Sequence, residues 1–225
     1  MFLSRLFESK SSYRRRKSKF IDAARNGRIN ELKECLREGK LRVDCQDKLA
    51  GETALLAAAR AGQKEVIDLL ISHNCNIDMQ SINFETALMV AVENGHMEVV
   101  ELLISHRCNM ECQNKVGWTA IMIAANNGFK DIVELLIAHK CNIDNRGKLG
   151  RTAFAYACMQ GHISIAISLI EAGCNHSIKD NAGKSGLDHL KEKKRSAVKE
   201  VQVTNILPLL FGFPPNHFMH TNLYI

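Results

Sequence analysis

Residues 84–116 read FETALMVAVENGHMEVVELLISHRCNMECQNKV, and this stretch holds two short apolar segments joined at a glycine. Thr86 precedes the first segment, as a helix N-cap residue does, and Gly95 follows its end. In the second segment apolar residues recur from Val99 onward at the i, i+3, i+4 spacing of an amphipathic helix. The stretch therefore predicts two short helices followed by a polar turn.

The same pattern returns every 33 residues on both sides of this stretch. Three residue types keep one register: Thr53, Thr86, Thr119 and Thr152; Gly62, Gly95, Gly128 and Gly161; Cys75, Cys108, Cys141 and Cys174. Helices of this length are marginal in isolation, so neighbouring copies must stack to bury their apolar faces. The period predicts an all-α solenoid of helix–turn–helix units with short β-turn or hairpin connections.

The repeat divides the chain into three predicted parts. We expect a basic, disordered N-terminal tail at 1–17, a repeat domain at 18–200 and an apolar C-terminal tail at 201–225. The last part either packs on the final unit or stays free of it. Within the repeat domain the expected units are 18–50, 51–83, 84–116, 117–149, 150–182 and 183–200. The first and last copies are degenerate, which suits the end caps of a stack.

The second helices carry the expected core. We assign Leu69, Leu102, Leu135 and Leu169 to one register position and predict that all four are buried. A buried leucine of this kind contributes about 2–5 kcal/mol to stability when it is compared with alanine.

The net charge of +6 comes entirely from residues 1–19, which hold seven basic residues and one acidic residue. The densest part is Arg14, Arg15, Arg16, Lys17 and Lys19. Three interpretations stay open. The run is a solvated tail, a patch for nuclear import or for weak contact with nucleic-acid phosphates, or a contact with an anionic membrane surface. Ser18 lies in this run and is a candidate for a basic-directed kinase at the expected N-terminus of the first helix.

Composition argues against several other classes. No apolar run approaches the roughly 20 residues of a membrane helix. Every one of the eight cysteines fits a repeat position, so we expect reduced thiols without disulfides in a cytoplasmic protein, with the nucleus as an alternative. His106, Cys108 and Cys112 are candidate zinc ligands by residue type, but their spacing does not assemble a closed tetrahedron. Phosphate-binding loops and catalytic constellations are absent, so we expect no enzyme, metal or cofactor.

The period, the Thr-Ala-Leu opening and the Asn94-Gly95-His96 link resemble the ankyrin repeat family over residues 18–200. The resemblance implies a non-enzymatic scaffold that binds a partner protein. One departure concerns the glycine that usually ends the second helix, which survives only as Gly173. Its replacements, Asn74, Arg107 and Lys140, should adopt the left-handed conformation at an energetic cost.

By this resemblance the partner should bind a concave face formed by turn tips and inner helices. The candidate contacts are Trp118, Arg151, Glu85, Arg60, Asn126, Asn127, Lys148, Lys115, Ile82 and Met159. Trp118 is the leading candidate, because its register position otherwise holds charged residues, which we interpret as solvent-facing. No stacking role is expected for it, although the indole covering its neighbouring turn is the structural alternative.

Overall fold

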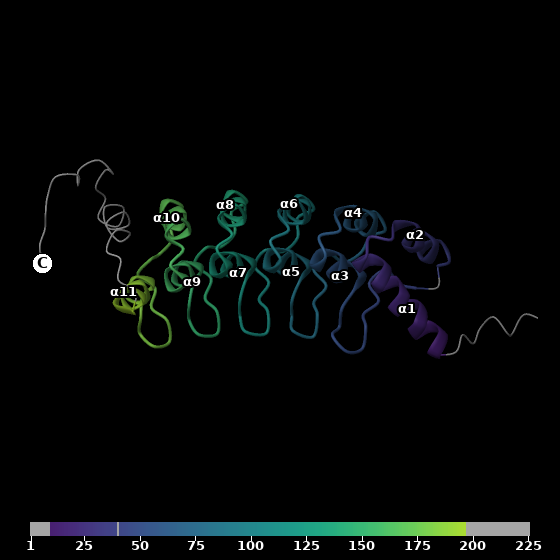
Figure 1. The fold of residues 1–225 in the computed structure, drawn as a ribbon, viewed down its shortest axis with the longest axis horizontal. Coiled ribbons are helices and arrows are strands. Elements are labelled where there is room, and N and C mark those ends of the chain that lie inside the picture. The colour runs from purple at the N-terminus through teal and green to yellow at the C-terminus, as the bar shows by residue number, and fades with distance from the viewer. Residues whose placement is uncertain (1–9, 40, 197–225) are drawn as a thin grey trace, which may run out of the picture. The chain divides into compact units, whose positions relative to one another are not determined.

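The computed structural model describes residues 10–39 and 41–196, and over these ranges the chain is built from eleven helices (Figure 1). The only bridge between extended residues within these ranges is an isolated antiparallel one between Lys179 and Ser185. The prediction of an all-α repeat fold is confirmed. The chain divides into two compact parts, residues 1–115 and 116–225, here called the N-terminal half and the C-terminal half.

The N-terminal half contains three helix pairs in two layers. The first helices of the pairs pack in one layer, and the second helices form the other layer, while the turns leave the opposite side of the first layer (Figure 1). The helices are α1 (Lys10–Arg25), α2 (Ile29–Arg37), α3 (Ala54–Arg60), α4 (Lys64–Ser72), α5 (Ala87–Glu93) and α6 (Met97–Ser105).

The described residues of the C-terminal half repeat this arrangement with two complete pairs and a further helix after them. Its helices are α7 (Ala120–Asn127), α8 (Lys130–Ala138), α9 (Ala153–Gln160), α10 (Ile163–Glu171) and α11 (Gly186–Ser196). Helix α9 packs against both α7 and α11. Ser185 takes the threonine position before α11, and its hydroxyl oxygen accepts a hydrogen bond from the Asp188 amide at 3.3 Å.

The recurring threonines precede the first helices, as the period predicts. Three of their hydroxyl oxygens accept a hydrogen bond from the amide three residues later, which satisfies a donor that the helix leaves free. These are Thr53, Thr86 and Thr152, at 3.1, 3.4 and 3.4 Å. Thr119 occupies the same place, but its buried hydroxyl has no hydrogen-bond partner within the ranges that the structure describes.

The expected left-handed residues after the second helices are confirmed. The φ angles of Asn74, Arg107 and Lys140 are 57°, 59° and 60°. A fourth residue of this kind was not anticipated. Phe84 has a φ of 58°, at a position that is glycine in the other copies, Gly51, Gly117, Gly150 and Gly183. A bulky aromatic residue in this conformation is a backbone outlier.

The predicted core register of the second helices is wrong by one residue. Leu70, Leu103, Leu136 and Leu169 share one position and are all 0% exposed. Leu69, Leu102 and Leu135 are only half-buried, and Ser168 is their equivalent in α10. Consecutive helical residues are turned by about 100°, so only one of two adjacent leucines can face the first helices. Leu169 was assigned to the buried set correctly, but it does not share a position with Leu102.

The N-terminal segment also differs from expectation. Residues 10–17 are helical, because α1 begins at Lys10 and continues into the core residues Phe20 and Ile21. Arginine and lysine are good helix formers, so a basic run can extend a helix that is anchored further along. Ser18 therefore lies inside α1 and not at its N-terminus. The expectations for residues 1–9 and 201–225 fall outside the residues that the structure describes.

Candidate binding surface

The turns of each half are built by the same backbone hydrogen bonds. In four turns an amide donates to a carbonyl across the turn: Asp47 to Glu52, Ser81 to Glu85, Gly147 to Arg151 and Asp180 to Lys184. A further bond joins each tip to the next. In the N-terminal half the Ile82 amide donates to the Ala50 carbonyl at 3.0 Å, and in the C-terminal half the Asn181 amide donates to the Leu149 carbonyl at 3.0 Å. The tips within each half therefore form a continuous row.

Large apolar side chains are exposed along these rows. Leu49, Ile82 and Phe84 are 89%, 58% and 52% exposed in the N-terminal half, and Val116 and Leu149 are 54% and 55% exposed in the C-terminal half. Ile82 is the one nominated candidate in this group. Leu49 could have been found from the sequence, since it occupies the position of Ile82 in the preceding repeat. Phe84 could have been found as the aromatic residue at a glycine position.

The nominated residues Arg60 and Glu85 of the N-terminal half belong to a chain of ion pairs. Glu52, at 8% exposure, pairs with Arg25, and its other oxygen lies 3.4 Å from Arg60 Nε. A guanidinium nitrogen of Arg60 lies 3.9 Å from a Glu85 oxygen. The position before the capping threonine is therefore a buried pairing site at Glu52, which corrects its interpretation as solvent-facing.

The same position in the C-terminal half holds Trp118, which has a stacking partner. Its ring centroid lies 4.6 Å from that of Tyr156, with the two planes inclined at 58°. Trp118 is half-buried, and burial raises the pKa of the Tyr156 phenol. The expectation that Trp118 has no stacking role is wrong. The alternative, that the indole covers neighbouring structure, describes this contact.

Arg151 takes part in a network around a buried carboxylate. Its Nε lies 3.1 Å from Asp180 Oδ2, and His189 Nε2 lies 2.8 Å from the same oxygen. The other oxygen accepts hydrogen bonds from the Ala182 and Lys184 amides. Burial by itself would raise the pKa of Asp180, but the hydrogen bonds from Lys184, His189 and Arg151 hold it well below its usual range. The ion pair of Arg151 therefore stabilises this part of the C-terminal half.

The remaining candidates are more accessible. Asn126 and Asn127 end α7, and the Asn126 side chain accepts a hydrogen bond from Gln160 Nε2 at 2.9 Å. Met159 is half-buried, while Lys115 and Lys148 are exposed at turn tips. The structure thus places four candidates in the N-terminal half, Arg60, Ile82, Glu85 and Lys115, and six in the C-terminal half, Trp118, Asn126, Asn127, Lys148, Arg151 and Met159.

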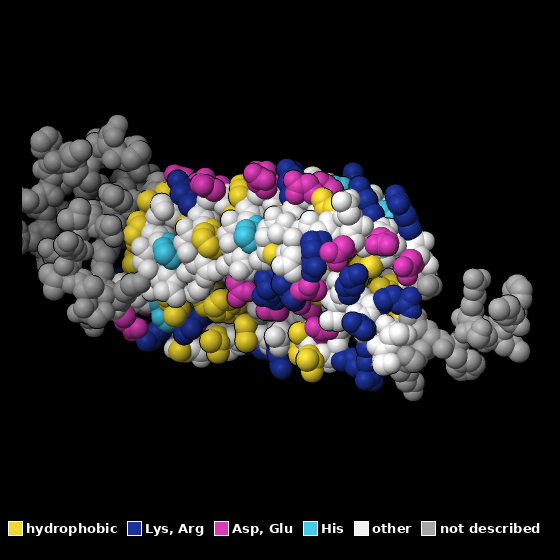
Figure 2. All heavy atoms as spheres, turned by 45° about the vertical axis from the view of Figure 1, so that its right-hand side comes forward, with side chains coloured by type: hydrophobic (Ala, Val, Ile, Leu, Met, Phe, Trp, Pro, Cys, Tyr) yellow, Lys and Arg dark blue, Asp and Glu magenta, His cyan; other side chains and the backbone are white. Residues whose placement is uncertain are grey.

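The basic run lies on helix α1. Arg14, Arg15 and Lys19 are exposed, whereas Arg16 and Lys17 are half-buried, and Arg16 lies 3.5 Å from a Glu38 oxygen. Figure 2 shows Lys and Arg side chains gathered toward the right-hand end of the view, the end where Figure 1 draws α1. Folding therefore gives this charge a fixed surface in the N-terminal half.

All eight cysteines are free thiols. Burial raises the pKa of Cys75 to about 11 and those of Cys108, Cys158 and Cys174 to about 12. Little thiolate is present at neutral pH when the pKa is this high. Within the described ranges, no group of three or more His, Cys, Asp and Glu side chains is arranged to hold a metal ion. No helix in these ranges has the length and apolar character needed to cross a membrane.

These features define a protein class: a helical repeat protein with exposed turn tips and with first helices (α3, α5, α7 and α9) that are accessible only at their C-terminal ends. The family model for ankyrin repeats, in three copies, matches residues 20–114 and 98–180. The chain therefore belongs to the ankyrin repeat family. Ankyrin repeats are generally protein–protein interaction modules and typically non-enzymatic binding scaffolds. No protein with a curated description matches the chain.

Proposed function

We propose that this chain is a non-enzymatic adaptor that captures a partner protein on the turn tips and first helices of its repeats. The carrying observation is Phe84, which is 52% exposed and has a left-handed backbone at a glycine position. This conformation costs a residue with a side chain about 1–2 kcal/mol. Exposed apolar surface adds nothing to the core, so a cost of this kind at a turn tip supports a role in recognition.

Glycine has a steric reason at this position in other repeats. A Cβ added to Gly51 would lie 2.9 Å from the Ile82 amide nitrogen, and one added to Gly117 would lie 2.6 Å from that of Lys148. The position therefore favours glycine for folding alone. Phe84 departs from this preference beside Ile82, and the two exposed side chains supply a compact apolar contact for a partner.

The nominated residues fill different roles in this proposal. Ile82, Lys115 and Lys148 supply contacts at exposed tips. Trp118 offers only its exposed part, since the rest packs on Tyr156. Arg60, Glu85 and Arg151 tune the charge of the surface through their ion pairs. We place the adaptor in the cytoplasm, with the nucleus as the alternative location.

Affinity capture with the full chain tests the proposal. The bait carries a photo-crosslinking amino acid at position 82 or 149, and control baits carry it at Asp68 or Glu101, which are exposed on the second helices. We expect one set of proteins to cross-link at the turn tips and not at the control positions. The same set should be lost from an Ile82→Ser/Leu149→Ser double variant and retained by Asp68→Ser/Glu101→Ser.

Two results would contradict the adaptor role. Equal capture by the turn-tip and control variants would show that the tips are not the contact surface. Capture that requires nucleic acid or anionic lipid in the sample, and that disappears in moderate salt, would favour the phosphate or membrane interpretation, because such contacts weaken steeply with ionic strength.

A further inference from the structure

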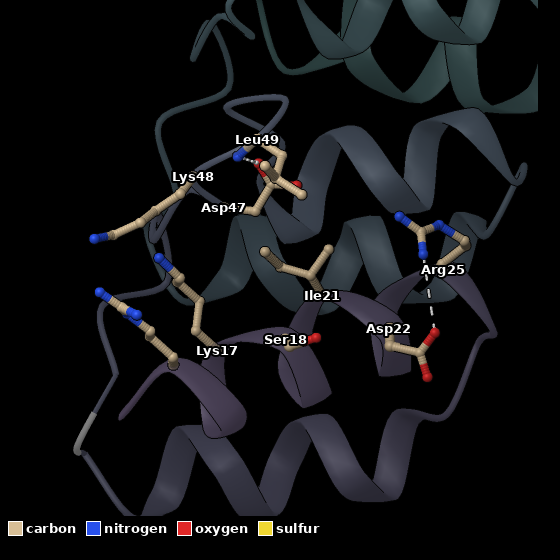
Figure 3. Close-up of a pocket in the computed structure, with 9 residues that line it drawn as sticks. Lys17, Ser18, Ile21, Asp22, Arg25, Asp47, Lys48 and Leu49 are labelled. Carbon is tan, nitrogen blue, oxygen red and sulfur yellow. Dashed lines mark hydrogen bonds and ion pairs between the residues drawn. The ribbon is translucent and has the colours of Figure 1, made fainter. Parts of the chain in front are cut away.

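A cavity of about 400 Å³ opens between helix α1 and the first turn of the N-terminal half (Figure 3). One helical face of α1, running from Arg14 to Arg25, forms one wall, and residues 47–49 form the other. In Figure 3 Ile21 extends from α1 toward the turn and lies in the middle of the cavity. The helical turns of α1 before Phe20 contribute Arg14, Lys17 and Ser18 to this wall, so the site depends partly on a helical segment that the repeat pattern did not predict.

The acidic side chains in the cavity already have partners. Asp22 pairs with Arg28 and lies 3.9 Å from Arg25, a contact drawn in Figure 3. One oxygen of Asp47 accepts hydrogen bonds from the Leu49 and Ala50 amides at 3.1 and 2.7 Å. These carboxylates therefore stabilise the turn and the helix end, and arginines or backbone amides already compensate their charge.

The basic side chains that line the cavity differ from these acids in their pairing. Arg14, Lys17 and Lys48 line the cavity, and none of them forms an ion pair with a residue in the described ranges. Lys17 and Lys48 come from opposite walls, yet their side chains lie on the same side of the cavity in Figure 3. Two lysines on one side, with Arg14 also in the lining and the acids paired within the fold, make the cavity a site for an anionic group.

An apolar contact adjoins these cations. Ile21 is 4% exposed and forms part of the inner wall, whereas Leu49 is 89% exposed on the rim. An exposed leucine in a cavity that is also lined by these cations matches a ligand that carries an apolar group next to its negative charge.

We propose that this cavity binds an acidic segment of a partner protein, in which a carboxylate or phosphorylated side chain lies beside an apolar one. This inference rests on the proposed adaptor function and adds the chemistry of the partner. A polyphosphate such as nucleic acid fits less well, because Asp22 and Asp47 also line the cavity and no aromatic ring is present for base stacking. A membrane surface would require a wider apolar area than one leucine provides.

The test uses fluorescein-labelled peptides and the full chain. The probes are Glu-Glu-Leu-Glu-Glu, the same peptide with phosphoserine in place of the glutamates that flank leucine, and Gln-Gln-Leu-Gln-Gln as the uncharged control. Fluorescence anisotropy gives the affinity, and amide NMR shifts of the labelled protein locate the contact. We expect saturable binding of both charged peptides, shifts at Lys17, Lys48 and Leu49, and no saturation with the uncharged control.

Variants decide whether the cavity is responsible. Lys17→Gln/Lys48→Gln should raise Kd about fivefold or more, since each exposed charge contact contributes up to about 1 kcal/mol. Ser18→Glu places a negative charge on the cavity wall and should raise Kd by a similar factor. Lys19→Gln is the matched control, because Lys19 is exposed on the same helix and does not line the cavity. It should change Kd less than about twofold, with circular dichroism unchanged in every variant.

Several results would overturn the proposal. They are no saturable binding of either charged peptide, equal effects of Lys19→Gln and Lys17→Gln/Lys48→Gln, and amide shifts confined to other surfaces. A short DNA duplex or a phosphatidylserine vesicle that binds more tightly than both peptides at physiological salt would also overturn it. Failure here leaves the adaptor role standing if turn-tip capture persists, whereas lost capture with intact peptide binding would contradict only the turn-tip surface.

Discussion

Glu52 in the N-terminal half and Trp118 in the C-terminal half occupy the same repeat position, directly before a capping threonine. Glu52 is 8% exposed and is paired with Arg25 and Arg60. Trp118 is half-buried and packs on Tyr156 with ring centroids 4.6 Å apart. One backbone position thus accepts a carboxylate or an indole, provided that its surroundings supply the matching charge or ring.

A third residue at this repeat position, Arg151, has the opposite charge to Glu52. Arg151 lies one repeat after Trp118 and pairs with the carboxylate of Asp180, whereas Glu52 pairs with arginines. The position before the threonine therefore stabilises contacts within each half. Free surface for recognition lies instead at the turn tips, where Leu49, Ile82 and Leu149 have more than half of their area exposed.

The largest expected effect tests what the two halves share. Leu103→Ala and Leu136→Ala should each cost about 2–5 kcal/mol of unfolding free energy, because both side chains are fully buried. Leu102→Ala and Leu135→Ala, one residue earlier, should cost less, roughly 1–2 kcal/mol, because both side chains are only half-buried. Urea unfolding measures all four, and equal losses at adjacent leucines would contradict the corrected register.

The next effect concerns the buried carboxylate of the C-terminal half. Asp180→Asn should cost about 2–4 kcal/mol, because it leaves Arg151 and His189 without their anionic partner. The folded-state pKa of Asp180 is depressed, so its contribution is present above the unfolded value of about 3.9 and is lost as pH falls toward the folded value. Stability measured from pH 7 to pH 3 should fall less steeply in Asp180→Asn, and parallel curves would show that another group controls the decline.

A smaller effect tests the aromatic contact against the ionic one. Trp118→Ala and Tyr156→Ala should show a coupling energy of about 0.5–1.5 kcal/mol in a double-mutant cycle, as packed aromatic pairs do. The cycle Glu52→Gln with Arg60→Gln should give less, about 0.2–1 kcal/mol, because the Arg60 side chain is 42% exposed. Additive losses at Trp118 and Tyr156 would mean that their packing carries no specific interaction.

The last effect has the opposite sign. Phe84→Gly should raise the unfolding free energy by about 1 kcal/mol, because glycine adopts the left-handed conformation without steric cost. The same variant should weaken partner capture. Ile82→Ala, at a neighbouring exposed site with an ordinary backbone, is the control and should weaken capture without gaining stability. A loss of stability in Phe84→Gly would show that the ring packs on the turn and is structural.

Local features of the fold were predictable where one residue determines the outcome. Thr53 caps α3, and Asn74, Arg107 and Lys140 are left-handed, because their places in a fixed period require those conformations. The choice between Leu102 and Leu103 was not predictable in this way, since the i, i+3, i+4 spacing includes both. Which of them faces the first helices depends on the rotation of the helix within the stack.

The candidate site was predicted less completely than the fold. Ile82 was found as an exposed tip, but the register alone did not show that Arg60, Glu85 and Arg151 have charged partners or that Trp118 has an aromatic one. The partners Glu85, Asp180 and Tyr156 lie on other turns or helices, far away in the chain. The sequence identifies the position of a residue within the repeat, and only the packing of the helices and turns identifies the side chain that it contacts.

The sequence by itself determined the repeat, its period, the helix–turn–helix unit and the family, because these follow from local spacing and capping chemistry that recur in every copy. Only the tertiary structure decided which leucine is buried, which charges are paired, and that the basic run extends α1 to form one wall of a cavity with the turn at residues 47–49. The physical reason is that burial and charge pairing are properties of two surfaces in contact, whereas a linear sequence specifies each surface separately.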